Sequence, residues 1–275
     1  MIVDAHFHCW QLARGDYGWL TPALAPIHRD IGIEHWQREA LPFGVSAGVL
    51  VQAAPTEAET TFLLAQAARH DAVRGVVGWV DLLARDTPGR IAHLASTQPK
   101  LKGLRPMLQD LDDAAWILQP ALAPALDAMA AHGLVFDALV KPLHLPHLLV
   151  LCQRHPYLQV VIDHGAKPDI AGGQWQPWAD DLQRLARETT AVCKLSGLLT
   201  EAGPQPRRGA TLRWGSHLIA CFGLRRLLWG SDWPVLELAG HYRDWWHDTQ
   251  ALLAPLADAE RAAVLGANAQ RVYRL

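Results

Sequence analysis

The chain has 275 residues, half of them hydrophobic, and a formal net charge of −2 at pH 7. This length suits one large α/β domain, and the near-neutral charge without a long basic run excludes nucleic acid and anionic membranes as expected partners. The chain contains no apolar run long enough to span a bilayer and no signal-peptide pattern at its start, so we expect a cytoplasmic protein. Four widely separated cysteines predict reduced, buried thiols: Cys9, Cys152, Cys193 and Cys221.

Short apolar segments recur along the chain, and each is typical of a strand that is buried on both faces. They cover residues 1–8, 46–54, 73–81, 101–108, 133–140, 158–165, 190–197 and 224–234. Between and after them, apolar residues recur at helical spacing. The predicted helices lie within residues 55–70, 86–96, 121–133, 145–156, 177–189, 210–223, 241–254 and 258–273.

Local signals mark the ends of several predicted helices. Thr56 with Glu59 three residues later forms a capping-box pattern. Thr87 followed by Pro88 fits an N-cap and a first helical position, and Gly133 fits the end of a helix.

Strands that alternate with helices predict a (β/α)8 TIM barrel, formed by a single domain of residues 1–275. A doubly wound open sheet is the main alternative, although no GxGxxG motif follows an early strand. Residues 14–30 and 199–209 form long predicted loops. On a barrel, loops that follow the strands enclose the substrate.

Polar residues lie at the carboxyl ends of the predicted strands, where a barrel carries its chemistry. His6 and His8 are two apart on the first strand, so their side chains should point to the same side. His164 ends the sixth strand and Asp232 the eighth. One of the histidines could instead be an ordinary core residue, and Asp232 could cap a helix that begins near Pro234. Together, the four could bind one Zn²⁺, or the imidazoles could polarise a carbonyl while the carboxylate activates water.

Other residues near the predicted strand ends are candidates to bind a substrate. For each basic residue among them, a salt bridge is the alternative. Tryptophan makes flat apolar walls for ligands, and the chain has 12 of them. The candidates are Trp10, Gln52, Trp79, Arg105, Asp137, Lys141, Lys167, Lys194 and Trp233.

The motifs "DAHFHCW", "VIDHGAKP", "CKLSGL", "LLWGSDWP" and "GANAQRVYRL" occur in this order along the chain. Together they resemble the amidohydrolase superfamily, and within it the sugar-lactonase branch with L-fuconolactonase and L-rhamnono-lactonase. The more distant 2-pyrone-4,6-dicarboxylate lactonase is similar in pattern. The resemblance implies a (β/α)8 fold and hydrolysis of a cyclic carboxylic ester. It matches His6 and His8 to the first-strand pair, His164 to the sixth-strand histidine and Asp232 to the acid that activates water.

Two departures from the superfamily pattern argue against a two-metal site. Members with two metals carry a carboxylated lysine at the end of the fourth strand, where this chain has Arg105, while Lys102 begins that strand. Many members have a histidine at the end of the fifth strand, but His144 lies beyond it here. We therefore expect one Zn²⁺ or no metal.

The expected function is hydrolysis of a sugar lactone, such as L-fuconolactone, to the aldonic acid. Two alternatives remain open. One is metal-dependent decarboxylation of an aromatic or muconate-type acid on the same scaffold, and the other is non-catalytic binding of a sugar acid. The sequence leaves the oligomeric state open.

Overall fold

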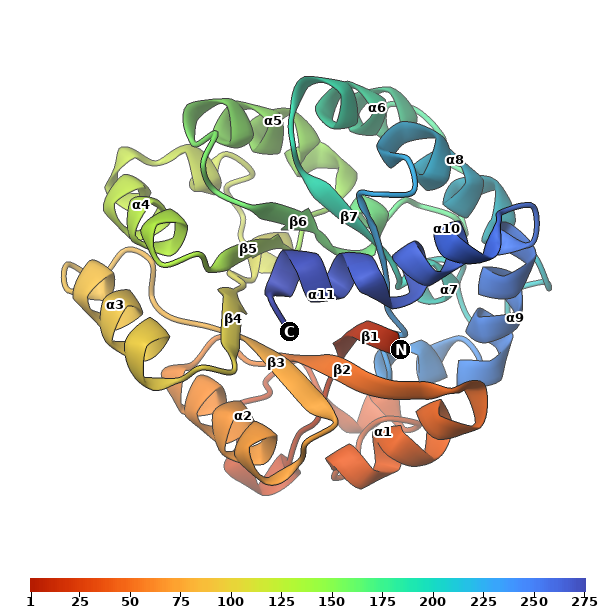
Figure 1. The fold of residues 1–275 in the computed structure, drawn as a ribbon, viewed down its shortest axis with the longest axis horizontal. Helices are drawn as coiled ribbons and strands as arrows, with labels where there is room; N and C mark the ends of the chain where they lie inside the picture. The colour runs from red at the N-terminus through yellow and green to blue at the C-terminus, as the bar shows by residue number, and fades with distance from the viewer.

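The computed structural model describes residues 1–275 and shows parallel strands that form a nearly closed barrel with helices around it (Figure 1). The strands pair in chain order, from β1 to β8. Each strand overlaps one of the predicted apolar segments, which confirms the (β/α)8 prediction. The strands are β1 (Ile2–Phe7), β2 (Val45–Val51), β3 (Val73–Gly78), β4 (Leu101–Leu104), β5 (Val135–Ala138), β6 (Val160–Ile162), β7 (Val192–Leu195) and β8 (Leu227–Trp229).

The barrel closes between β1 and the segment that follows β8. The backbone N–H of His8 donates to the carbonyl oxygen of Trp233 at 2.8 Å, and the N–H of Asp232 donates to the carbonyl of His6 at 2.8 Å. These two hydrogen bonds hold the first and last strands side by side. They also place three of the four candidate site residues next to one another.

Helices cover the outside of the barrel, and nine of the eleven lie in the predicted helical segments. The two that were not predicted are α1 and α7, both short. The helices are α1 (Ile33–Ala40), α2 (Glu57–Arg69), α3 (Thr87–Thr97), α4 (Ala123–Ala131), α5 (Leu145–Arg154), α6 (Trp178–Glu188), α7 (Leu198–Glu201), α8 (Leu212–Phe222), α9 (Tyr242–Leu253), α10 (Asp258–Ala262) and α11 (Asn268–Tyr273).

The predicted helix ends are partly confirmed. The Thr56 hydroxyl accepts from the backbone N–H of Glu59 at 3.0 Å, but the Glu59 carboxylate does not reach back, so the capping box is incomplete. Helix α3 begins at Thr87, which makes Asp86 the N-cap in place of Thr87. Gly133 follows α4 with a positive φ of 65°, as expected for a glycine that ends a helix.

Small and β-branched side chains fill the inside of the barrel, among them Val3, Ala5 and Val49. The same cluster includes Val272 and Tyr273 from α11. Figure 1 shows why, because α11 crosses the end of the barrel at which the two chain termini lie. The C-terminal helix therefore closes the floor of the barrel, and the opposite end is free to hold a site.

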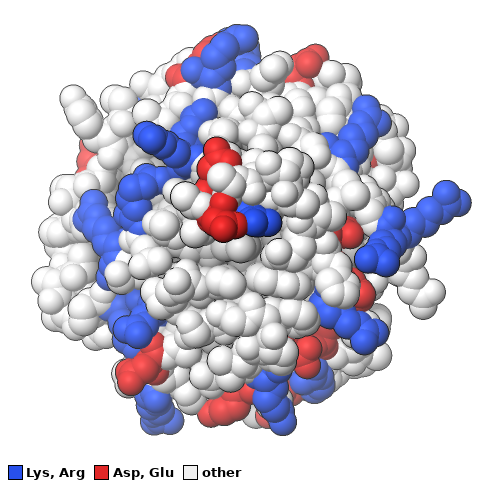
Figure 2. Space-filling model, turned by 45° about the vertical axis from the view of Figure 1, so that its right-hand side comes forward, with Lys and Arg blue, Asp and Glu red and all other residues white.

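Figure 2 shows both signs of charge on one face of the molecule. Several Lys and Arg side chains follow one another down the left side of this view, and the others are separated by uncharged surface and by acidic side chains. None of the helices has the combined length and apolar character that crossing a membrane requires. All four cysteines are free thiols, and three of them are buried.

Candidate active site

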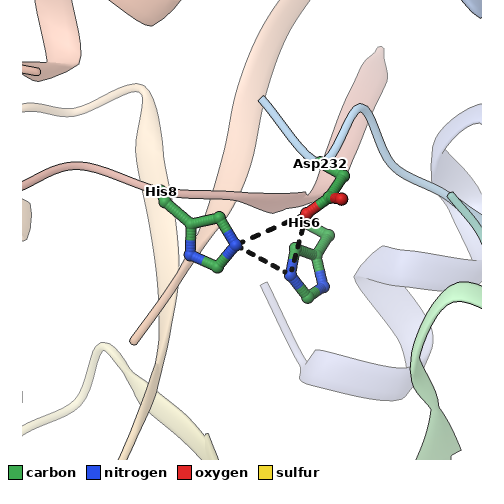
Figure 3. Close-up of side chains that lie close together, drawn as sticks. All are labelled: His6, His8 and Asp232. Carbon is green, nitrogen blue, oxygen red and sulfur yellow. Dashed lines mark hydrogen bonds and ion pairs between the residues drawn. The ribbon is translucent and has the colours of Figure 1, made fainter. Parts of the chain in front are cut away.

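Three imidazoles and one carboxylate converge at the carboxyl ends of the strands. Asp232 Oδ1 lies 3.5 Å from His8 Nε2, 3.7 Å from His6 Nε2 and 3.7 Å from His164 Nε2. The Nε2 atoms of His6 and His8 are 3.2 Å apart (Figure 3). All four side chains are almost completely buried. The structure thus brings together the four residues that the sequence analysis selected.

An irregularity in β1 lets both histidines point into the barrel mouth. The pairing of β1 with β2 shifts register between Asp4 and Phe7. Before the shift, Val3 and Ala5 face the barrel interior, and after it Phe7 stacks outward on Trp36 at 4.0 Å. A bulge re-aims side chains in this way.

The site residues that follow β6 and β8 adopt backbone conformations that are rare outside glycine. His164 has a φ of 54° and Asp232 a φ of 59°, both in the left-handed region. Such conformations store strain and are concentrated at functional sites. The His164 ring also needs an adjacent glycine, because a Cβ on Gly197 would lie 2.6 Å from His164 Cγ.

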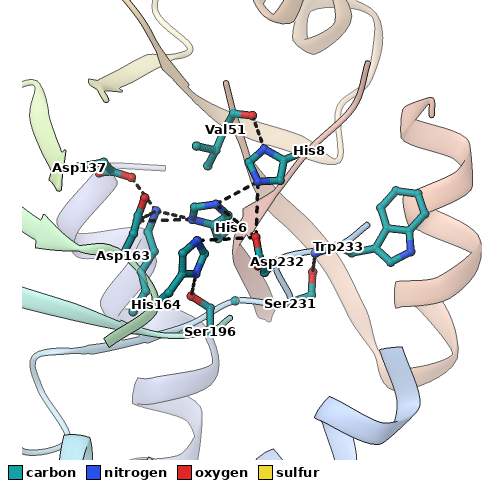
Figure 4. Close-up of polar contacts among 12 residues, drawn as sticks. His6, His8, Val51, Asp137, Asp163, His164, Ser196, Ser231, Asp232 and Trp233 are labelled. Carbon is teal, nitrogen blue, oxygen red and sulfur yellow. Dashed lines mark hydrogen bonds and ion pairs between the residues drawn. The ribbon is translucent and has the colours of Figure 1, made fainter. Parts of the chain in front are cut away.

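Two of the imidazoles have their other ring nitrogen fixed by a neighbour. His8 Nδ1 lies 2.8 Å from the carbonyl oxygen of Val51, which can only accept, so His8 carries its proton on Nδ1 and a lone pair on Nε2. His164 Nδ1 lies 2.9 Å from the Ser196 hydroxyl (Figure 4). These contacts aim both Nε2 atoms at Asp232.

The electrostatics favour an ionised Asp232 beside neutral imidazoles of His6 and His164. Burial alone would raise the pKa of Asp232, but the adjacent imidazoles of His164, His8 and His6 hold it well below its ordinary value. Burial lowers the pKa of His164 to about 4, although Asp232 partly opposes this shift. At neutral pH, Asp232 can therefore accept a proton, and the imidazoles can act as ligands or hydrogen-bond partners.

The spacing of His6, His8 and Asp232 fits three ligands of a tetrahedral metal ion. The distances from Asp232 to the ring nitrogens are too long for hydrogen bonds. Ligand atoms around zinc, at bond lengths of 2.0–2.1 Å, lie about 3.3 Å from one another. The observed 3.2–3.7 Å separations are close to that value. His6, His8 and Asp232 could therefore hold one metal ion, and His164, whose Nε2 lies 3.7 Å from Asp232 Oδ1, is a candidate fourth ligand.

A second possible ligand group contains His6, Asp163 and His164, but cations already surround it. Lys194 Nζ lies 2.9 Å from Asp163 Oδ1, and Arg105 Nη1 lies 3.1 Å from Oδ2. Another metal ion at Asp163 would compete with these two positive charges. The surroundings of Asp163 thus agree with the expectation of no more than one metal.

Arg105 and Gln52 lie beside the four converging side chains. Arg105 Nη1 is 3.4 Å from His6 Nε2, and its Nη2 donates to the carbonyl of Gln52. The Gln52 amide donates to the Arg105 carbonyl at 2.8 Å, while its Oε1 and the Arg105 Nε have no partner. Both residues retain polar atoms that a substrate could satisfy, so their role in substrate binding stays a prediction.

Asp137 and Lys194 pair with each other inside the barrel. Both side chains are completely buried, as is that of His6. Lys194 Nζ pairs with Asp137 Oδ2 at 2.5 Å, and the Tyr273 hydroxyl donates to the same carboxylate at 2.9 Å. The predicted substrate contacts of both residues stay predictions.

Two of the predicted tryptophan walls are closed off. The ring of Trp10 is fully buried, and its Nε1 donates to the Arg29 carbonyl. Trp233 is 1% exposed, and its Nε1 donates to Glu237 at 2.8 Å, away from the imidazoles (Figure 4). These two residues pack the walls of the site, and neither offers a free ring face to a ligand.

The remaining candidates lie at the surface or at a cavity. Lys167 is half-buried and forms an ion pair with Glu201 at 3.1 Å. Lys141 is exposed. Trp79 is half-buried and lines the cavity described below. The predicted substrate contacts of these three residues stay predictions.

A cavity of about 450 Å³ opens among the loops that follow β1 to β4. Its walls combine three indole rings, those of Trp19, Trp79 and Trp116, with the carboxylates of Asp16 and Asp81. The cavity lies next to the imidazoles, and Gln52 connects the two. Gln52 directly follows Val51, whose carbonyl oxygen contacts His8 Nδ1, and the Gln52 side chain contacts Met107 of the cavity wall.

The structure adds residues that the sequence did not select. Asp163 precedes His164 in the motif "VIDHGAKP" and is an acidic residue at the end of a predicted strand. Ser196 is likewise a polar residue at the end of a predicted strand. Trp19 and Trp116 lie in loops, where no periodic pattern indicates which way a side chain points. Their place in the cavity wall emerges only from the fold.

Comparisons with known proteins agree with this geometry. An amidohydrolase family model matches residues 3–275. A curated L-fucono-1,5-lactonase of Burkholderia ambifaria is 46% identical over 99% of this chain and 95% of its own length. Another, from Burkholderia multivorans, is 34% identical over 99% of this chain and 96% of its own length.

A solved structure is also similar over the full length. It is the crystal structure of an amidohydrolase from Burkholderia multivorans with bound zinc, with a TM-score of 0.92 and 33% identity, and the match covers 100% of this chain and 99% of that one. From its barrel, its site and these matches, the chain belongs to the amidohydrolase family.

Proposed function

We propose that residues 1–275 form a single catalytic domain that hydrolyses a sugar lactone, of the L-fucono-1,5-lactone class, to the aldonic acid. The observation that carries this proposal is the convergence of three imidazoles on the carboxylate of Asp232. The relatives named L-fucono-1,5-lactonase support the lactone class of substrate.

In the proposed reaction, Asp232 activates the attacking water. Its ionised carboxylate takes a proton as the water oxygen bonds to the lactone carbonyl carbon. The bond between that carbon and the ring oxygen then breaks. Asp232 returns the proton to the departing alkoxide, which leaves a hydroxy acid.

Without a metal, imidazole N–H groups that face the mouth of the barrel stabilise the negative charge that develops on the carbonyl oxygen, and His8 is not among these donors because its N–H is bonded to the Val51 carbonyl. Each well-placed N–H donor contributes about 3 kcal/mol to this stabilisation. A zinc ion held by His6, His8, His164 and Asp232 would supply Lewis-acid polarisation of the same carbonyl. Burial of the four side chains excludes bulk water and strengthens these electrostatic effects.

The cavity beside the imidazoles suits the rest of a sugar lactone. Indole faces of Trp79 and Trp116 provide flat apolar walls, and the carboxylates of Asp16 and Asp81 can accept hydrogen bonds from hydroxyl groups. Oδ1 of Asp16 is buried without a partner, as expected of an acceptor that a ligand hydroxyl satisfies. Arg105 and Gln52 lie between this cavity and the imidazoles, because Arg105 contacts His6 and Gln52 contacts Met107 of the cavity wall.

Hydrolysis of L-fucono-1,5-lactone, followed with a pH indicator, tests the proposal. Replacing Asp232 with Asn should lower kcat by about 10²–10⁴-fold, because the general base is lost. Thermal unfolding of the variant should stay cooperative, as for the wild type. Near-normal turnover by a folded Asp232→Asn variant would remove Asp232 from the chemistry.

The same assay decides whether a zinc ion or the imidazoles polarise the lactone carbonyl. The wild-type protein is treated with a chelator, and its zinc content and rate are measured together. A rate that falls with the zinc content and returns on adding zinc assigns the polarising role to the metal. Full activity without zinc assigns that role to the imidazoles.

Two further measurements separate the proposal from its alternatives. Release of carbon dioxide from aromatic acids, without acid production from lactones, would identify a decarboxylase. Binding of aldonolactones without turnover would identify a sugar-acid binding protein.

A further inference from the structure

His6 differs from the other two imidazoles in what faces its second ring nitrogen. His8 and His164 have a carbonyl oxygen and a hydroxyl there. His6 Nδ1 instead lies 3.0 Å from the ammonium nitrogen of Lys194. An ammonium group can only donate, so it calls for a lone pair on His6 Nδ1.

The surroundings of Lys194 keep its three N–H groups in place. The ammonium nitrogen lies 2.5 Å from Asp137 Oδ2, 2.9 Å from Asp163 Oδ1 and 3.0 Å from His6 Nδ1. The side chain is completely buried, and so are its three partners. Nζ donates to Asp137 Oδ2 and lies within hydrogen-bond distance of His6 Nδ1, whereas its contact with Asp163 Oδ1 is an ion pair without hydrogen-bond geometry.

Asp163 is the one acceptor that competes for His6 Nδ1. Its Oδ1 lies 3.4 Å from Nδ1, which is too long for a good hydrogen bond, whereas Lys194 lies closer to both atoms. A proton on His6 Nδ1 would point at the cation. The shorter contact therefore favours the lone pair on Nδ1.

The contacts at His6 Nε2 favour a proton there. His8 Nε2 carries a lone pair and lies 3.2 Å away, and Asp232 Oδ1 is a second acceptor at 3.7 Å. The one opposing donor is Arg105 Nη1 at 3.4 Å, which also donates to Asp163 at 3.1 Å. Figure 4 shows Asp163 on one side of the His6 ring and His8 and Asp232 on the other.

We propose that Lys194 is a positioning residue that fixes His6 as the Nε2–H tautomer. His6 then presents an N–H to the mouth of the barrel, while His8 presents a lone pair. A donor and an acceptor thus lie side by side above Asp232. The catalytic consequence, donation by His6 to the substrate carbonyl oxygen, rests on the proposed lactonase function.

The same tautomer opposes metal binding at His6. A metal ligand needs its lone pair on Nε2, and ligating histidines ordinarily donate their other N–H to a carboxylate, carbonyl or water. Lys194 blocks that arrangement, although Asp163 stands within reach to provide it. Removing the ammonium would let Asp163 accept from His6 Nδ1 and would free Nε2 for a metal.

Nitrogen-15 NMR of the histidine rings tests the tautomer directly, because protonated and unprotonated ring nitrogens resonate at well-separated shifts. We expect an Nε2–H tautomer for His6 and an Nδ1–H tautomer for His8 in the full-length wild-type protein after treatment with chelator. The His6 signals are assigned from their loss in His6→Gln. A proton on His6 Nδ1 in the wild type would overturn the proposal, and this measurement needs no Lys194 variant to fold.

Lys194→Met then tests the cause. His6 should change to the Nδ1–H tautomer, and the affinity for added zinc should rise about tenfold. Lys167→Met removes a cation near His164 that does not contact His6, so it controls for charge alone and should leave the His6 tautomer unchanged. A folded Lys194→Met protein that keeps the Nε2–H tautomer would contradict the proposed role. Both readouts are independent of turnover, so they remain decisive even if no lactone is hydrolysed.

Discussion

Asp4 is a completely buried carboxylate on β1 that joins distant parts of the chain. It accepts from the backbone N–H of Ser231 at 2.8 Å and from the Ser231 hydroxyl at 2.5 Å. The indole N–H of Trp36 donates to it at 2.9 Å, and the Tyr242 hydroxyl at 3.3 Å. Because Ser231 precedes Asp232, Asp4 fixes the position of the site carboxylate without contacting it.

Replacing Asp4 with Ala should lower the free energy of unfolding by about 3 kcal/mol or more. The loss arises because the donors on Ser231, Trp36 and Tyr242 would be left buried without partners. Urea unfolding at neutral pH measures the change. Asp127→Ala, on the exposed face of α4, is the matched control and should change stability by no more than about 0.5 kcal/mol. An Asp4→Ala protein as stable as this control would contradict the assignment.

At the residue scale, the sequence predicted the four converging side chains because each lies close to the carboxyl end of its strand. The same rule also selected Asp137 and Lys194, which pair with each other inside the barrel. Each is one position before the end of its strand, as His6 is in β1, so position within the strand does not distinguish them from the converging residues. Tyr273, which contacts Asp137 from the C-terminal helix, has no local signal at all. Depth along a barrel depends on strand stagger, which the sequence does not display.

At the scale of elements, Glu59 fastens the long loop after β1 to the first turn of α2. Its carboxylate accepts from the Tyr17 hydroxyl at 2.7 Å and from the backbone N–H of Ala53 at 3.1 Å, and Arg14 lies 3.3 Å away. Burial raises the pKa of Glu59 to about 7, against the opposing effect of these contacts. The capping-box pattern was misleading because Glu59 binds this loop instead of Thr56.

The raised pKa predicts a specific pH dependence of stability. The folded protein keeps the Glu59 proton up to a pKa of about 7, whereas the unfolded chain loses it near the ordinary pKa of 4.5. The folded state therefore binds more protons in this window, and the free energy of unfolding should fall by about 3 kcal/mol as the pH rises through it.

Urea unfolding of wild type and Glu59→Gln across this pH window measures the effect. The variant should lack the fall, so the two curves should diverge. Glu57→Gln changes an exposed acid on the same turn and should follow the wild type. Parallel curves for wild type and Glu59→Gln would show that Glu59 is ionised throughout.

Helix α1 shows what the sequence could have revealed at this scale. Ile33, Trp36 and Ala40 form its buried face at helical spacing, directly after Gly32. Most of the other helices were predicted because each comes soon after a predicted strand. A long loop separates α1 from β1, so this signal was missing for α1. The bulge in β1 is different, because no residue type marks it.

At the scale of the whole molecule, the two chain termini meet at the floor of the barrel. Asn268 begins α11 and donates to the carbonyls of Leu224 and Leu227 at 2.7 and 2.9 Å, which fastens the helix beside β8. Gly266, just before it, packs against the first residues of β1, where a Cβ would lie 2.3 Å from the Met1 carbonyl oxygen. The floor therefore depends on close backbone contact between the two ends of the chain.

Replacing Gly266 with Ala should consequently destabilise the whole barrel. Its methyl group meets backbone atoms that cannot rotate away, so α11 or β1 must shift, at a cost of about 2 kcal/mol. Gly89→Ala is the matched control, because a Cβ there meets nothing within 4 Å inside α3 and should raise stability by about 0.5–1 kcal/mol. Urea unfolding of both variants compares the two. If both glycines responded alike, the end-to-end contact would not limit stability, and closure of the barrel would rest on the hydrogen bonds between β1 and the segment after β8 alone.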